Sequence, residues 1–246
     1  MKRNIFIATS IGAALSACSP IGTKLNENSG FHKVLESAER VNQNLIGTHG
    51  RVREYSRGDI SSDFPLNSFD TPSDALYTHL MADRFRSYNL IVDGAVEHPQ
   101  KLSLTQLQHL MNVSQITRHD CVEGWSAIAQ WQGARLTDVL AMARPKADAR
   151  YVVFHTFDVD ANGAPYYESL SLEQAAHPQT ILALHQNYKP ITPDRGAPVR
   201  LRVPTQLGYK SAKWVRRIEV VASMNKLYGG KGGYWEDQGY EWYAGI

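Results

Sequence analysis

The sequence has few cysteines, little net charge and no more than one long apolar run. Each of these shortages excludes a class of protein. Two cysteines in 246 residues cannot supply the framework of a disulfide-stapled domain. A net charge of +2 gives no reason to expect nucleic-acid binding. The chain also lacks internal repeats, low-complexity tracts and a second apolar span, which excludes solenoids, disordered chains and multi-span membrane proteins.

The N-terminus predicts export and lipidation. Lys2 and Arg3 precede an apolar segment, and the letters LSAC follow at residues 15–18. This order and length are typical of a signal peptide, here residues 1–17. LSAC resembles a bacterial lipobox, in which Cys18 would be acylated and would anchor the protein, at about 0.8 kcal/mol per buried methylene. We expect a periplasm-facing protein, anchored in the outer membrane because no retention signal follows Cys18; the alternative is an ordinary secreted protein.

The rest of the chain predicts a tether followed by one domain. Residues 18–62 are rich in polar side chains and contain one helix pattern, whose apolar face carries Phe31, Val34, Leu35, Ala38, Val41 and Leu45. That face packs on the main domain or docks a partner. Residues 63–246 are long enough for a single domain with a substantial core.

Short strands and short helices alternate irregularly within this domain. Apolar, β-branched content predicts strands at residues 90–92, 115–122, 151–156, 181–185, 199–203 and 214–222. Capping boxes at Ser103 and Ser171 predict two short helices, the second of which ends by His177 because Pro178 follows. No glycine-rich phosphate loop follows a strand, so a Rossmann-type domain is disfavoured and the fold class is α+β.

The run RHDCVEGWS at residues 118–126 places a cysteine among charged residues. If Cys18 is acylated, Cys121 has no intramolecular disulfide partner. A thiol beside arginine and histidine is biased toward thiolate, the form that attacks electrophiles and binds metals. A core cysteine is the alternative, and these residues alone do not decide between the two. A zinc or thiol hydrolase is a weaker reading, because no His-x-x-x-His pair surrounds a glutamate.

Positive charge is concentrated in one segment of a nearly neutral chain. Between residues 195 and 217 there are seven cations and no acidic residue: Arg195, Arg200, Arg202, Lys210, Lys213, Arg216 and Arg217. Arg200 and Arg202 are two apart on a predicted strand and so share a face. The run GYKSAK at residues 208–213 offers backbone N–H groups, a hydroxyl and two ammoniums, which suit a phosphate. The segment therefore predicts a polyanion pocket, or else a basic solvated face or a patch facing anionic lipid.

Three motifs occur in an order that resembles a known family. They are CVEGWS at 121–126, GAPVRLRVP at 196–204 and GYKSAKW at 208–214. Together they resemble the molybdopterin-binding domain of the sulfite oxidase family, and most closely the branch of periplasmic methionine sulfoxide reductase catalytic subunits. The resemblance extends from about Pro72 to the C-terminus, where GYEWYAGI is also similar. It implies a single domain of sulfite oxidase type, with mixed sheets and short helices.

The resemblance implies roles for individual residues. Cys121 would be the protein's thiolate ligand to molybdenum, whose remaining ligands come from the pterin dithiolene and from oxo or hydroxo groups. Thr156 would contact the pterin, and Arg200 would bind the cofactor. Ser211, Ala212 and Lys213 match the turn that contacts the phosphate. These roles would also account for the basic segment.

The chain departs from the family pattern in several places. Arg195 stands where the family often has asparagine before Gly-Ala-Pro, and Tyr77 and His79 stand in for an asparagine-rich cofactor contact. Sulfite-oxidising relatives follow the cysteine with arginines, whereas this chain has CVEGW, which favours a neutral or cationic substrate. Arg118 and His119 precede the cysteine and are catalytic candidates, as sources of positive charge or of a proton.

The implied chemistry is two-electron oxygen-atom transfer at molybdenum, most simply the reduction of a small sulfoxide-like substrate. No Cys-x-x-Cys-His is present, so we expect no c-type haem in the chain. Electrons would then come from a separate partner, a membrane or periplasmic cytochrome. The N-terminal run KRNIF matches a twin-arginine signal imperfectly. The alternative function is therefore a cofactor-free lipoprotein that uses the same fold as a binding module.

Overall fold

The computed structural model describes residues 50–66 and 69–246, which belong to a compact unit over Thr48–Ile246. The predicted signal peptide, Cys18 and the helix pattern over 31–45 lie outside the described residues. Residues 50–62, which the sequence assigned to the tether, are bonded to the domain: the backbone N–H of Tyr55 donates to Ile116 O (2.9 Å) and that of Ser61 to Ile128 O (3.0 Å). The compact unit thus begins upstream of the predicted boundary at 62/63. No helix among the described residues is long and apolar enough to cross a bilayer.

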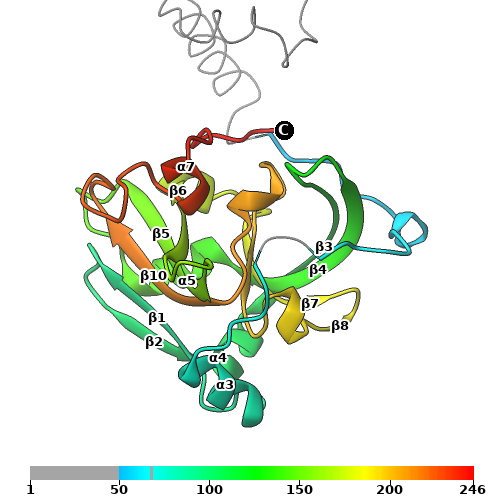
Figure 1. The fold of residues 1–246 in the computed structure, drawn as a ribbon, viewed down its shortest axis with the longest axis horizontal. Helices are drawn as coiled ribbons and strands as arrows, with labels where there is room; N and C mark the ends of the chain where they lie inside the picture. The colour runs from blue at the N-terminus through cyan, green and yellow to red at the C-terminus, as the bar shows by residue number, and fades with distance from the viewer. Residues whose placement is uncertain (1–49, 67–68) are drawn as a thin grey trace, which may run out of the picture. The chain divides into compact units, whose positions relative to one another are not determined.

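One mixed sheet has five strands in the order β2-β1-β10-β5-β6 (Figure 1). Their bounds are Asn89–Gly94 (β1), Gln100–Ser103 (β2), Tyr151–Val159 (β5), Pro165–Ser171 (β6) and Val215–Val221 (β10). Strand β1 pairs with β10 in parallel, in the register Ile91 to Arg217, and the other pairs are antiparallel. The sheet therefore joins segments from both ends of the domain.

A second, antiparallel sheet carries the cysteine. It contains β3 (Met111–Asp120), β4 (Ser126–Arg135), β7 (Ile181–Gln186) and β8 (Lys189–Pro190), with β9 (Arg200–Arg202) paired to β7. Strands β3 and β4 form a long curved hairpin (Figure 1). Its last register pair is Asp120 with Ser126, so Cys121 lies at the start of the hairpin's turn.

The helices are short and connect the strands. They are α3 (Ala75–Ala82), α4 (Leu104–His109), α5 (Leu136–Ala143), α6 (Leu172–Ala175) and α7 (Tyr234–Asp237), with 3-10 turns η1 (Arg57–Asp59), η2 (Pro193–Arg195) and η3 (Gly208–Lys210). Both predicted capping boxes are confirmed, because the Ser103 and Ser171 hydroxyls accept hydrogen bonds from N–H groups three residues on. Mixed sheets with few short helices confirm the predicted α+β class.

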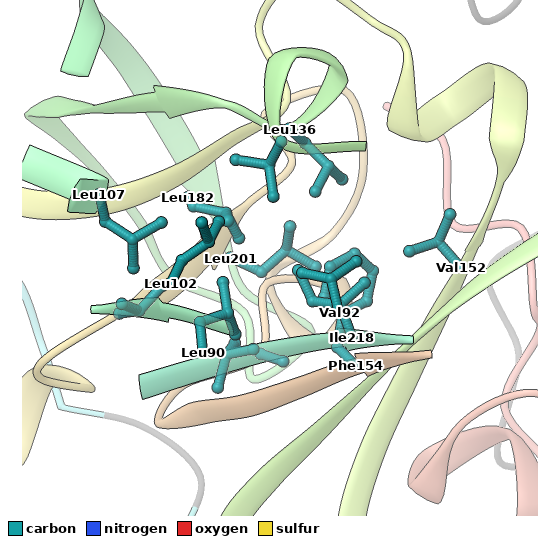
Figure 2. Packing of buried hydrophobic residues seen from close by; sticks show 14 of the residues in the cluster. Leu90, Val92, Leu102, Leu107, Leu136, Val152, Phe154, Leu182, Leu201 and Ile218 are labelled. Atoms are coloured by element: carbon teal, nitrogen blue, oxygen red, sulfur yellow. The ribbon is translucent and has the colours of Figure 1, made fainter. Parts of the chain in front are cut away.

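The main core lies between the two sheets. Figure 2 shows Leu90, Val92 and Ile218 of the mixed sheet pointing toward Leu182 and Leu201 of the other. All five are fully buried, and each buried side chain of this kind contributes about 1.5–3 kcal/mol. This packing fixes how the second sheet, which carries Cys121 and β9, lies on the first.

Candidate active site

A pocket opens where the β3–β4 turn meets the segment before β10 and the C-terminal residues. Its empty volume is about 590 Å³, part of it open to solvent. It is lined by Cys121, Val122, Glu123, Asp158, Tyr166, Arg200, Gly208, Tyr209, Ser211, Ala212, Lys213, Trp235 and Tyr240. The thiol, two cations and the GYKSAK turn, which are far apart in sequence, thus meet in one cavity.

A tight turn holds Cys121. Its N–H donates to Trp125 O (2.9 Å) and its O accepts from the N–H of Gly124 (3.0 Å). Gly124 has a φ of +90°, a left-handed conformation that glycine adopts without steric cost. Cys121 is 7% exposed. The hairpin therefore presents the thiol to the pocket from a well-bonded backbone.

Strand alternation directs Arg118 away from the pocket. Its side chain is 53% exposed and its Nε lies 2.9 Å from a carboxylate oxygen of Asp120. Arg118 lines a different hollow, with Val52 and Tyr55. This catalytic candidate therefore lies outside the cavity that holds Cys121.

His119 lies behind the pocket wall. It is fully buried between the rings of Phe64 and Trp125, whose centroids lie 5.4 and 5.5 Å from its own. Neither ring nitrogen has a hydrogen-bond partner among the described residues. Burial, followed by the charges of Arg202 and Arg200, holds the pKa of His119 well below its ordinary value. His119 is therefore neutral at pH 7 and separated from the cavity by Gly208.

Arg200 and Arg202 share a face, as the two-residue spacing predicted. Both guanidinium groups lie over the Trp131 ring, at 5.3 and 5.6 Å from its centroid. Arg202 donates to Arg118 O (2.5 Å) and Arg200 to Arg195 O (3.3 Å). Arg200 lines the pocket, and its Nε has no partner within the described part of the chain. Burial lowers the pKa of Arg200 to about 10.

Four of the seven cations in the basic segment are withdrawn from solvent. Arg200, Arg202, Lys210 and Lys213 are all buried. The Nζ of Lys213 donates to Phe69 O (3.1 Å) and lies 4.0 Å from the Trp214 ring centroid. Burial and the charge of Arg200 lower the pKa of Lys213 to about 7. A concentration of buried cations favours an anionic ligand, because buried charge needs compensation.

In the turn over residues 208–213, some polar groups bond to the rest of the fold and others line the pocket. Lys210 does not line the cavity; its Nζ contacts Glu168 and Glu236, 2.5 Å from each. The Ser211 hydroxyl accepts from the N–H of Val203 (3.1 Å). Ser211, Ala212 and Lys213 line the pocket. Of the two ammoniums expected to face a phosphate, the geometry thus brings one to the cavity.

Four predicted cofactor contacts lie outside the set that lines this pocket. Thr156 is buried beside it, where its hydroxyl donates to Tyr166 O (2.8 Å). Arg195 donates to Phe64 O (2.8 Å) and lines a neighbouring hollow. Tyr77 is in the core and donates to Ala197 O (2.7 Å), whereas His79 is exposed on α3.

The structure also brings to the pocket Asp158, which the sequence did not single out, and two aromatic residues of the C-terminal segment. Asp158 is 3% exposed, and burial raises its pKa to about 6. Trp235 and Tyr240 form an aromatic wall, with stacked rings whose centroids lie 5.2 Å apart and whose planes are inclined by 29°. The signal for Asp158 was present, since it is the one carboxylate in a largely apolar strand, two residues after Thr156.

These residues fit an anionic, sulfur-bound metal group. Arg200 offers a buried guanidinium N–H without a partner, the next turn offers backbone and ammonium donors, and Cys121 offers a soft sulfur ligand. Within the described ranges, no group of three or more His, Cys, Asp or Glu side chains is close enough to hold a metal ion. A thiol beside buried cations suits a metal cofactor that carries a phosphate.

Comparison with known sequences agrees with this geometry. A family model described as "Oxidoreductase molybdopterin binding domain" matches residues 78–228. A putative protein-methionine-sulfoxide reductase subunit YedZ1 of Azospira oryzae is 37% identical over 191 residues, 78% of this chain and 66% of that protein. The protein-methionine-sulfoxide reductase catalytic subunit MsrP of Campylobacter jejuni is 29% identical over 238 residues, 92% of this chain and 75% of its own length. The chain thus spans about two thirds to three quarters of these relatives.

A solved structure shares the fold. The sulfane dehydrogenase SoxCD from Paracoccus pantotrophus aligns with a TM-score of 0.50 and 22% identity, over 56% of this chain and 39% of that one. At this identity the likeness concerns the fold alone. Together with the family match, it confirms the fold that the sequence resemblance implied.

Proposed function

The chain belongs to the family of oxidoreductase molybdopterin-binding domains, as its three motifs predicted, and we propose that it reduces sulfoxide-like substrates by two-electron oxygen-atom transfer. One observation carries the proposal: Cys121 shares a pocket with the buried cations Arg200 and Lys213. The names of two relatives, both called subunits of methionine-sulfoxide reductases, support the direction of turnover.

Cys121 would hold the molybdenum, and the cation-lined side of the pocket would hold the pterin phosphate. A soft thiolate suits a metal whose other ligands are dithiolene sulfurs. Arg200, Ser211, Ala212 and Lys213 would bind the anionic end through charge-assisted hydrogen bonds. When bound, this group supplies the two-electron oxygen-atom transfer that amino-acid side chains cannot perform.

The protein's own groups select the substrate. At the pocket's exposed edge, Glu123 accepts a hydrogen bond from the Trp125 indole (3.0 Å), and its charge disfavours anions. Arg118, the nearest cation along the strand, points to solvent. Trp235 and Tyr240 provide an apolar wall that keeps water away and contacts thioether-like groups favourably. This edge supports a neutral or cationic sulfoxide in preference to sulfite.

The sequence supports two further parts of the proposal, the source of the electrons and the cellular location of the enzyme. The chain carries no Cys-x-x-Cys-His, so a separate electron carrier, such as a membrane or periplasmic cytochrome, would reduce the site. Relatives described as subunits support such a partner. Acylation of Cys18 would hold the enzyme at the periplasmic face of the outer membrane.

Metal analysis of the protein purified from its native envelope tests this function. We expect about one molybdenum per chain and reduction of methionine sulfoxide with a reduced viologen dye as electron donor. Cys121→Ser is expected to stay folded while losing both molybdenum and turnover. Val122→Ala, which changes the exposed neighbour of the thiol, is the matched control and should keep its metal. A folded envelope protein without molybdenum would contradict the proposal and support the binding-module alternative.

A further inference from the structure

The proposed reaction consumes protons, and this inference rests on that proposed function. Reduction of one sulfoxide to its sulfide breaks the sulfur–oxygen bond, takes up two electrons and two protons, and releases one water. The separate electron carrier supplies the electrons. A proton donor placed beside the reacting oxygen accelerates such a step, and an acid that lines the pocket could fill this role.

Asp158 is an acid buried in the wall of this pocket. It is the second-last residue of β5 and lines the same cavity as Cys121. The residue is 3% exposed, and its Oδ1 has no hydrogen-bond partner among the described residues. A buried carboxyl with an unused oxygen costs free energy. A group that enters the cavity can complete its hydrogen bonding.

The other ionisable groups near the pocket are exposed, hydrogen-bonded to other residues or outside the cavity. Glu123 is exposed and bonded to the Trp125 indole. The Tyr166 hydroxyl donates to Tyr209 O (2.7 Å), and the Tyr209 hydroxyl donates to Glu241 O (2.6 Å). His119 lies behind Gly208. Among the described residues that line this pocket, Asp158 is thus the buried carboxyl.

The surroundings of Asp158 favour its protonated form. Burial raises its pKa to about 6, against hydrogen bonds from Thr156 and from its own backbone and the charge of Lys213. Lys213, Tyr166 and Tyr77 interact with it electrostatically. The other ionisable residues that line its cavity are Cys121, Glu123, Arg200, Tyr209 and Tyr240. A bound phosphate would offset the two cations and so raise the pKa of Asp158 further. The carboxyl would then carry a proton near neutral pH.

We propose that Asp158 is the proton donor to the oxygen atom that leaves the sulfoxide. Its O–H bond breaks as a new O–H bond forms on the departing oxygen. The resulting carboxylate regains a proton from solvent through the pocket's open edge, and solvent also supplies the second proton. Asp158 is not among the residues that would hold the cofactor, so replacing it tests the proton transfer without removing a cofactor ligand.

Asp158→Asn keeps the shape and removes the acid. In the cofactor-loaded enzyme we expect kcat for methionine sulfoxide to fall by about 100-fold or more, with unchanged molybdenum per chain. Wild-type kcat should fall as pH rises through the carboxyl pKa, and this limb should be absent from the variant. Asp158→Glu should recover part of the rate. Asp148→Asn, the same change at an exposed aspartate, is the control.

Infrared spectroscopy supplies a readout that does not depend on turnover. The resting loaded protein should show the carbonyl stretch of a buried protonated carboxyl, which disappears in Asp158→Asn and persists in Asp148→Asn. A wild-type rate and pH profile in Asp158→Asn, or a band that survives the substitution, would overturn this inference alone. A loaded wild-type enzyme that leaves methionine sulfoxide unreduced would overturn the proposed function and this inference together.

Discussion

The ammonium nitrogen of Lys210 lies 2.5 Å from a carboxylate oxygen of Glu236, with both side chains removed from solvent. A second buried carboxylate, Glu168, contacts the same ammonium. The three residues belong to η3, α7 and β6. This ionic contact therefore ties the turn that lines the pocket to the helix that carries Trp235.

Breaking that contact should destabilise the fold. Lys210→Met leaves two carboxyl groups buried without their cation, and we expect the free energy of unfolding to fall by about 3–5 kcal/mol. Replacing all three, as Lys210→Met with Glu168→Gln and Glu236→Gln, should cost less than the single change. Urea denaturation measures both. Glu241→Gln, at an exposed neighbour, should stay within about 0.5 kcal/mol of wild type, and a Lys210→Met protein as stable as wild type would contradict the prediction.

Arg200→Met should affect stability and cofactor content in opposite directions. In the cofactor-free protein the guanidinium is buried, and burial lowers its pKa to about 10, which reflects a cost that the variant removes. We expect the cofactor-free variant to gain about 1–3 kcal/mol and the protein purified from cells to lose molybdenum. Arg216→Met, at an exposed cation of the same segment, should do neither. A less stable Arg200→Met protein would argue against an anion site.

The lowered pKa of Lys213 predicts that the stability of the cofactor-free protein rises with pH. Its pKa is lowered from 10.5 to about 7, so between these values the unfolded chain binds more protons than the folded one. Stability of the cofactor-free protein should therefore rise with pH across this window, by about 3–5 kcal/mol in all, with the full penalty present below pH 7. Lys213→Met should flatten the rise in urea denaturation, whereas exposed Lys226→Met should preserve it. A profile that Lys213→Met leaves unchanged would refute the assignment.

Gly208→Ala tests the contact behind the pocket. A Cβ at this position would lie 2.4 Å from Nε2 of His119, so we expect a loss of about 1–3 kcal/mol from overpacking. His119→Ala in the same chain should return most of that loss, a coupling that a double-mutant cycle measures. Gly58→Ala, whose Cβ would meet nothing closer than 3.7 Å, is the control. Additive effects of Gly208→Ala and His119→Ala would contradict this contact.

Local signals predicted much of the fold. The capping boxes at Ser103 and Ser171 appeared where expected, because each depends on residues three apart. The predicted β-branched segments all became strands, such as β5 and β10. Strand β4 was missed because its alanines and glutamines have weak strand propensity and both of its faces are packed. Helix α5 was missed because no side chain caps its start.

The site was harder to predict, because sequence neighbours need not share a face. Arg118 is three residues from Cys121, yet the pleat of β3 turns it to solvent. The sequence identified the positive charge of the basic segment, but it did not show which cations face the pocket. Lys210 instead forms a buried ionic contact with Glu168 and Glu236, which are distant in sequence. Only the tertiary fold separates the cations that face the pocket from those that hold it together.

The parallel pairing of β1 with β10 has a consequence for how the protein is made. Strand β1, near Ile91, can pair with β10 only after residues near Arg217 have been synthesised. Pairing between segments so distant in sequence is slow to form. A nascent chain still attached to the ribosome before β10 emerges has its thiol-bearing hairpin but not the sheet that supports the opposite wall. We therefore expect the pocket to be ready for its cofactor only after β10 has paired with β1.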